Sequence, residues 1–277
     1  MINETAALTF RALRKWVRNP ASIMPGLFTA MFYLALFGSS FNPTNLIPSS
    51  AGPYASSILQ AAFGGAPTYI TYLTSGVICI ILVFNMAFGG IDLVLDRQLG
   101  YLNSLLTAPV PRAAIYLSGV AQNLVKVGIL AVLTFFVALI IPNGLQLPAS
   151  FSVLDFLGIG AAFTLLGLGL SFVFTSLALS VRSIDSLVAI VNFLTLPIMF
   201  MSNAFFPSSS FPSWLKAIAD VNPVSKTNEA ARLLIINGSL SSSQVATYGW
   251  DMAYLVVFAA IMGVIGYLAA RRALRPE

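Results

Sequence analysis

A few polar side chains interrupt long apolar runs of this sequence, and these are the residues with most scope for chemistry. Lys126 lies twelve residues into an apolar segment at 114–141, about 18 Å along a helix. Asn123 precedes it by one helical turn on the same face. Polar groups at such depth commonly face a bundle interior or a polar cavity, which makes them candidates for lining a pathway. We favour the simpler alternative, in which they form hydrogen bonds between helices and Lys126 extends to the membrane interface.

The candidate residues for a substrate pathway all lie in apolar segments. They are three amides, one lysine and two phenylalanines: Asn85, Asn123, Lys126, Asn192, Phe193 and Phe200. Other chemistries are excluded. The chain contains no histidine and a single cysteine, Cys79, so a histidine-based triad, a histidine-ligated metal and an internal disulfide cannot form. The sequence has no P-loop and no serine in a G-x-S-x-G turn. We therefore expect no catalytic site, metal or cofactor in this chain.

Composition places these residues in a membrane protein. Hydrophobic residues make up 58% and charged residues 8% of the 277 residues, and mean hydropathy is +0.89. Soluble domains carry about 25% charged residues. The surface must therefore be apolar as well as the core, as lipid contact requires. The length suits one all-α transmembrane domain over residues 1–277.

Six apolar segments are predicted to cross the membrane: 23–41, 69–91, 114–141, 153–180, 187–203 and 250–270. Basic residues predict the orientation, because cytoplasmic loops of membrane proteins are rich in lysine and arginine. With both termini inside, ten basic residues are cytoplasmic and three, Lys216, Lys226 and Arg232, are outside. The net charge of +5 is then explained without nucleic acid.

Two segments outside the spans have helical patterns. Residues 4–18 are amphipathic, which predicts a helix lying on the inner membrane surface; the alternative is a basic flank that only fixes topology. Residues 92–113 carry leucines at helical spacing before Pro109 and Pro111. A short helix there would suit the groove of a partner protein, or would equally be a connector on the membrane surface.

The longest predicted outer loop covers residues 204–249. It contains two short stretches with helical spacing, which Asn222 and Pro223 separate, and then GSLSSSQ, which is interpreted as a flexible turn. No carboxylate lies clearly at mid-membrane, where a proton-coupled secondary transporter would need one. Energy is therefore expected to come from another subunit.

Two blocks of the sequence carry a recognisable pattern. The first block is DRQLGYLNSLLTAPVPR at 96–112, with the pattern at Asp96, Arg97, Gly100, Leu102, Leu105, Pro109 and Arg112. The second block, at 196–234, has it at Leu196, Pro197, Ser202, Phe206, Pro207, Pro212, Trp214, Asn222, Pro223, Glu229 and Arg232. Both blocks resemble the type-2 ABC exporter permeases, especially those of daunorubicin and doxorubicin resistance. The blocks occur in the family's order within six spans, so the resemblance covers nearly the whole chain.

The resemblance implies a type V exporter fold with an interfacial helix at 4–18, a coupling helix at 93–106 and short re-entrant helices within 204–236. The first block's matching residues would form the coupling site. The outer gate would comprise Phe206, Pro207, Pro212, Trp214, Asn222, Pro223, Glu229 and Arg232.

Such permeases act as homodimers or pair with a paralogous permease. Each of the two permeases binds a separate cytoplasmic ATPase subunit, which holds ATP and magnesium. A small hydrophobic or amphipathic substrate, such as a drug, lipid or natural product, would pass outward between protomers by alternating access. The expected location is the lipid of a prokaryotic plasma membrane. A polysaccharide exporter, a secondary transporter and a membrane-embedded enzyme are the alternatives.

Overall fold

The structure is a computed structural model that describes residues 2–19, 24–40, 60, 63–101, 107, 110–141 and 144–273. Within these ranges the regular elements are helices, and no strand occurs. The α-helices are α1 (Ile2–Val17), α2 (Met24–Ser40), α4 (Tyr69–Phe88), α5 (Ile91–Gln98), α7 (Arg112–Ile140), α8 (Val153–Ser180), α9 (Ile184–Phe200), α10 (Ser213–Asp220), α11 (Pro223–Asn237) and α12 (Ser242–Ala273). A short 3-10 turn, η4 (Ser208–Ser210), precedes α10.

Four helical stretches of the described chain are long and apolar enough to cross a membrane: Tyr69–Gln98, Arg112–Ile140, Val153–Ser180 and Ser242–Ala273. Two other apolar helices are shorter, at Gly26–Phe37 and Ile184–Phe200. A 17-residue helix is about 25 Å long, slightly less than the roughly 30 Å of bilayer hydrocarbon. The chain is thus an all-helical, multi-pass membrane protein, and the expected count of six spans stays a prediction.

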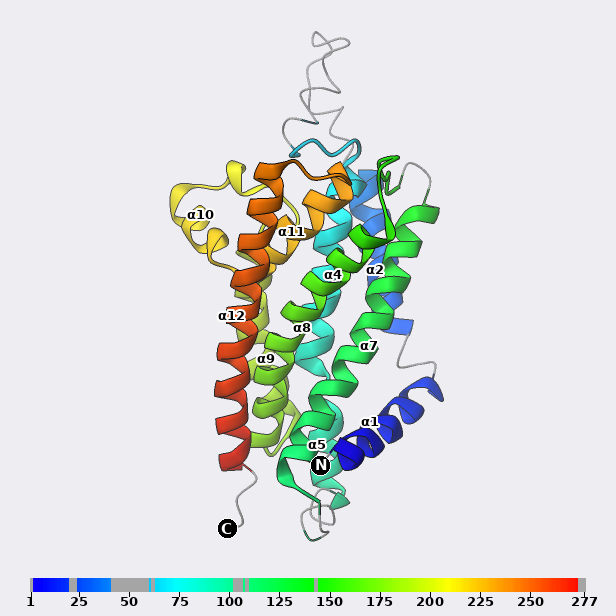
Figure 1. Cartoon of the computed structure of the whole chain (residues 1–277). Helices are drawn as coiled ribbons and strands as arrows, with labels where there is room; N and C mark the ends of the chain where they lie inside the picture. The colour runs from blue at the N-terminus through cyan, green and yellow to red at the C-terminus, as the bar shows by residue number, and fades with distance from the viewer. Residues whose placement is uncertain are drawn as a thin grey trace.

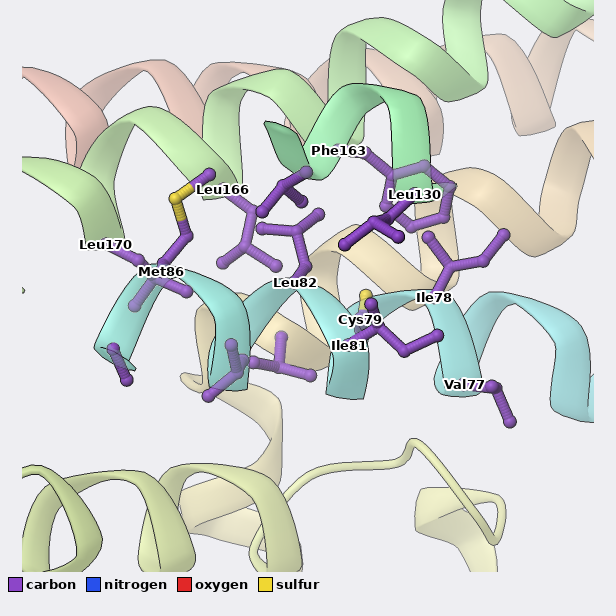
Figure 2. Close-up of a cluster of buried hydrophobic side chains, with 14 of the residues drawn as sticks. Val77, Ile78, Cys79, Ile81, Leu82, Met86, Leu130, Phe163, Leu166 and Leu170 are labelled. Carbon is purple, nitrogen blue, oxygen red and sulfur yellow. The ribbon is translucent and has the colours of Figure 1, made fainter. Parts of the chain in front are cut away.

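Helix α4 forms the centre of the bundle. It contacts α2, α7, α8, α9 and α11, and nearly all of its side chains are buried. Figure 2 shows Ile78, Leu82 and Met86 of α4 pointing towards Phe163 and Leu166 of α8. Helix α12 packs mainly along α8 and α11. One side of α12 therefore covers the core. Its other side exposes many apolar side chains on the surface, as contact with lipid requires.

Helix α5 continues directly from α4. Gly89 and Gly90 between them keep right-handed helical backbone angles, so Tyr69–Gln98 forms one 30-residue helical stretch. Both glycines lie against neighbouring helices: an added Cβ would be 2.5 Å from Asn123 Oδ1 at Gly89 and 2.4 Å from Ala178 Cβ at Gly90. The helix expected at 93–106 therefore begins at Ile91, and residues 102–106 lie outside the described ranges.

Helix α12 begins eight residues before the apolar segment predicted at 250–270. The interpretation of GSLSSSQ as a flexible turn is wrong from Ser242 onward. The Ser241 backbone N–H and hydroxyl both donate to Gln244 Oε1, at 2.9 and 3.1 Å, and Gln244 N–H donates to the Ser241 hydroxyl at 3.4 Å. This is the capping-box arrangement, which satisfies donors left open at a helix start.

The two ends of the bundle differ in charge. Figure 1 shows α1, α5 and the end of α12 at one end, with α10 and α11 at the other. The α1 end carries the three basic residues of α1 and Arg18 just after it, together with Arg97, Arg112, Arg182, Arg271 and Arg272. Arg275, the tenth residue of that basic set, lies outside the described ranges. Lys216, Lys226 and Arg232 lie on α10 and α11.

Candidate functional site

The first candidate site is the α5 junction, defined here by Lys15, Asp92, Arg97 and Lys126. Asp92 on α5 joins two other helices, because one oxygen lies 3.5 Å from Lys15 Nζ of α1 and the other lies 3.2 Å from Lys126 Nζ of α7. The Lys126 side chain is only 12% exposed. A buried ammonium needs a counter-charge, and Asp92 supplies it. This contact supports a structural role for Lys126.

Arg97 attaches α5 to the end of α8. Its guanidinium donates to the carbonyl oxygens of Leu179, at 2.5 Å, and of Val181, at 3.1 Å. The last carbonyls of a helix have no intrahelical donor, and a cation is favoured there by the helix dipole. Arg97 therefore acts as a cap for another helix. These two hydrogen bonds go to backbone 84 and 82 residues away in the sequence.

The remaining positions of the first block lie in different surroundings. Gly100 follows α5 with φ +77°, a left-handed conformation that glycine adopts at helix ends without strain. Asp96 lines a small cavity of about 50 Å³ beside Arg11 and Lys15 of α1. Arg112 is exposed at the start of α7. Leu102, Leu105 and Pro109 lie outside the described residues.

The tip of α5 presents an apolar side chain to its surroundings, since Leu99 is 80% exposed. Next to it, the Arg11 guanidinium lies 3.8 Å from the centre of the Tyr101 ring. Helix α1 itself packs on α7 and buries Trp16, while Ile2 and Phe10 remain exposed. Such an arrangement suits a helix at a membrane surface with the α5 tip held beside it.

The second candidate site is the α11 network, defined by Tyr72, Asn203, Ala204, Glu229 and Arg232. Buried Arg232 donates from Nε to the Tyr72 carbonyl at 3.1 Å and from a terminal nitrogen to the Ala204 carbonyl at 3.0 Å. Its guanidinium carbon also lies 3.6 Å from the centre of the Tyr72 ring. One arginine thus joins α4, α11 and the segment that follows α9.

Asparagines fix the same segment. Asn222 caps α11 by accepting from Val224 N–H at 2.9 Å, and its amide donates to the carbonyls of Ile198 and Met201 at 2.7 and 3.2 Å. Asn203 N–H donates to the Ser225 hydroxyl at 3.1 Å. The backbones approach so closely that a Cβ at Gly76 of α4 would lie 2.0 Å from Ala204 O.

A lysine links the α11 network to α12. Lys226 Nζ lies 2.8 Å from Glu229 Oε2 and 3.5 Å from Asp251 Oδ1 of α12. Burial alone would lower the pKa of Lys226, but the hydrogen bond and charge of Glu229, together with Asp251, raise the pKa above its usual range. Lys226 therefore stays protonated at neutral pH and holds the two carboxylates together.

The expected gate residues lie in different surroundings. Asn222, Glu229 and Arg232 belong to α11 or its cap, and each makes a polar contact with the segment that follows α9, at Met201, Asn203 and Ala204 respectively. Pro212 caps α10, and Trp214 on α10 is 62% exposed. The other members are Phe206, which is exposed, Pro207 before η4, and Pro223 at the first position of α11.

The expected pathway residues also separate. Asn85 on α4 donates to Ile81 O at 2.8 Å, and Asn123 on α7 lies against Gly89. Asn192 is half-buried on α9, where Phe193 and Phe200 are 78% and 62% exposed on the surface. The two phenylalanines are seven residues apart and share a helical face. The structure therefore forms two sets, one around α4 and α7 and one on the outer face of α9.

Sequence reasoning did not select several residues of these sites. The Tyr72 ring contacts the Arg232 guanidinium, and the Asn203 amide donates to Glu229. Asp92 forms an ion pair with Lys126, and Asp251 forms one with Lys226. One signal was present: each missed acid is a rare charge beside an apolar helix, where a partner of opposite sign is expected. The partner itself could be found only from the tertiary arrangement.

The long apolar helices form one bundle, and buried polar contacts join them near both ends. These features define a multi-pass membrane protein. Residues 3–236 match the family model described as ABC-2 type transporter. The chain therefore belongs to the ABC-2 type transporter family, which confirms the resemblance predicted from the two sequence blocks.

Individual relatives agree with this assignment. The chain is 26% identical to the putative transport permease ycf38 of Cyanophora paradoxa over 284 residues, covering 99% of this chain and 90% of the relative. It is 26% identical over 283 residues to a probable doxorubicin resistance ABC transporter permease protein, DrrC, of Mycobacterium tuberculosis, with coverage of 97% and 90%. A daunorubicin resistance ABC transporter permease protein, DrrB1, of Streptomyces coeruleorubidus is 21% identical over 234 residues, with coverage of 84% and 75%.

Proposed function

We propose that this chain is the transmembrane permease subunit of an ATP-driven exporter that moves a hydrophobic or amphipathic molecule outward by alternating access. One observation carries the proposal. The helical stretch Tyr69–Gln98 joins the α5 junction to the α11 network. Its 30 residues correspond to about 45 Å, enough to cross the membrane and extend beyond it.

The α5 tip is the proposed contact with a separate ATPase subunit, which binds ATP and magnesium. A displacement applied at the tip can be transmitted only if α5 is held firmly. Asp92 fixes α5 to α1 and α7, and Arg97 fixes it to α8. Leu99 remains exposed beyond these contacts, as an apolar residue that enters a partner's groove must be.

The α11 network is the proposed gate at the other end. Because Arg232 bonds to Tyr72 O of α4, movement of α4 must move or break a contact with α11. The exposed face of α9, with Phe193 and Phe200, is the proposed wall of the pathway between two permease protomers. The second protomer is a copy of this chain or a paralogous permease, and two ATPase subunits complete the assembly.

The proposed orientation has both termini in the cytosol of a prokaryote, with the chain in the plasma membrane. Arginine and lysine gather at the α1 end of the bundle, and this asymmetry favours that end as the cytoplasmic one. The substrate class follows from the apolar side chains on α9 and from the drug-resistance relatives, whose names refer to doxorubicin and daunorubicin. A drug, a lipid or a natural product belongs to this substrate class.

Reconstitution with a separate ABC ATPase subunit that co-purifies with the chain tests this function. ATP should drive accumulation of doxorubicin, used as the probe, in inside-out vesicles. Arg97→Gln should lower transport about tenfold while ATP hydrolysis continues, because α5 loses its attachment to α8. Arg271→Gln, at an exposed position on α12, is the matched control and should transport normally. Equal transport by the wild-type and Arg97→Gln complexes would contradict the coupling role.

A further inference from the structure

A large cavity lies away from both candidate sites, between α7 and α8. Its volume is about 700 Å³, within the roughly 300–1,000 Å³ typical of small-molecule sites. The floor is made by Ile78, Leu82 and Met86 of α4, which Figure 2 shows side by side. The cavity therefore reaches inward from the space between α7 and α8 to the central helix of the bundle.

Two glycines make room for this cavity. Gly128 on α7 and Gly160 on α8 both line it, and a Cβ added at either position would meet no atom within 4 Å. Val132 and Leu157, also in the lining, are exposed on the outer surface of the same helices. The cavity is thus an open-sided groove in the face of α7 and α8.

The groove offers a ligand almost no polar partner. Its lining is aliphatic and aromatic except for Thr164, whose hydroxyl already donates to Gly160 O at 2.7 Å. Water in such a site would lack the two to four polar partners that it needs. A ligand with buried polar groups would lose hydrogen bonds on entering. The chemistry therefore selects a hydrocarbon.

Its length corresponds to one leaflet. Along α7 the lining runs from Leu124 to Phe135, about 16 Å, and along α8 it runs from Phe156 to Leu165, about 14 Å. Half of the bilayer hydrocarbon is about 15 Å thick. Phe135 is near the end of α7 and Phe156 is near the start of α8, where Gly158 lies against Leu234 of α11, so the groove occupies the leaflet on the α11 side.

We propose that this groove binds one acyl chain of a membrane lipid from the leaflet on the α11 side. Lipid hydrocarbon is the apolar material that surrounds the exposed residues of α7 and α8 in a membrane, and the groove is continuous with that surface. An empty groove would leave the floor side chains without contacts on one side, and a chain supplies them. The proposal rests on the membrane assignment and is independent of the proposed export.

Photo-crosslinking tests it. The purified chain is placed in nanodiscs of phosphatidylethanolamine and phosphatidylglycerol with a trace of phosphatidylcholine that carries a diazirine at the end of one acyl chain. After irradiation, peptides covering 124–135 and 156–165 should carry more label than peptides from the exposed face of α12, around Val256 and Val264. The wild-type protein alone gives this comparison, so it does not depend on a variant folding.

Filling the groove gives a second comparison. The double variant Gly128→Leu with Gly160→Leu should lower labelling of 124–135 and 156–165 about tenfold. Gly249→Leu is the matched control, because Gly249 on α12 is another helical glycine with open space at its Cβ. Equal labelling of the groove and α12 peptides in the wild type would overturn the proposal. So would undiminished labelling in a double variant whose thermal unfolding matches that of the control.

Discussion

Replacing Arg232 with methionine removes the residue that joins α4, α11 and the segment after α9. Methionine keeps much of the side-chain length and apolar surface but has no donor. The carbonyl oxygen of Ala204 loses a charged donor at 3.0 Å, and the Tyr72 carbonyl loses one at 3.1 Å. The contact between the guanidinium and the Tyr72 ring is also lost.

The size of the effect follows from these contacts. Two hydrogen bonds from a charged donor contribute roughly 1.5–3 kcal/mol each, and a desolvated cation–π contact contributes about 2 kcal/mol. Burial of the guanidinium costs several kcal/mol and offsets part of this. Removing one partner of a buried charged network typically costs about 3–5 kcal/mol. We expect about 4 kcal/mol, or a fall in Tm of roughly 8–16 °C for a chain of this size.

Thermal unfolding of the purified protein in one detergent measures this change. Arg232→Lys keeps the charge but cannot reproduce the planar two-point contact, so its Tm should lie between those of Arg232→Met and the wild type. Arg271→Met, the same substitution at an exposed site on α12, should change stability by less than about 0.5 kcal/mol. If Arg232→Met unfolds at the same temperature as Arg271→Met, the reasoning about the α11 network is wrong.

Further substitutions test three other features by the same unfolding measurement. Asp92→Asn and Lys126→Met should each cost about 1–2 kcal/mol, with a coupling energy of roughly 1 kcal/mol in the double variant; strict additivity would argue against the ion pair. Gly100→Ala should cost about 1–2 kcal/mol because φ is +77°, and Gly100→Asn should cost less; equal losses would count against this backbone conformation. Gly76→Ala places Cβ 2.0 Å from a backbone oxygen and should lower Tm by several degrees, at roughly 2–4 °C per kcal/mol. Gly249→Ala, the control, should leave Tm unchanged or raise it. The reverse order of the two Tm values would refute the close approach at Gly76.

Much of the helical framework follows from local sequence. The apolar run at 153–180 coincides with α8, and Ser152 and Asp155 supply the capping box that begins it. The start of α12 was missed although Ser241 and Gln244 carry the same kind of signal, because a serine-rich stretch was interpreted as a turn. Helix ends are thus predictable where a capping pair is recognised before composition is considered.

The contacts of the candidate sites were less predictable. The sequence shows that Lys126 is a rare charge in an apolar segment, but its partner Asp92 is 34 residues away on another helix. Arg97 stands beside two aspartates in sequence and bonds instead to the backbone at the end of α8. Such pairings depend on how the helices pack, which helical periodicity alone does not specify. The family resemblance identified important blocks without giving their contacts.

The central claim, that the α5 tip transmits the work of an ATPase subunit, is tested most directly by a site-specific crosslink. The Cys79→Ser chain is co-expressed with its partner ATPase subunit, and a cysteine is placed at Leu99 or, as a control, at Val153, which is exposed at the opposite end of the bundle. The account predicts a crosslink between permease and ATPase from Leu99→Cys, none from Val153→Cys, and loss of ATP-driven transport once the Leu99 crosslink forms. Crosslinks to the ATPase from both sites would contradict the account. So would ATP-driven transport that continues after the Leu99→Cys crosslink has formed.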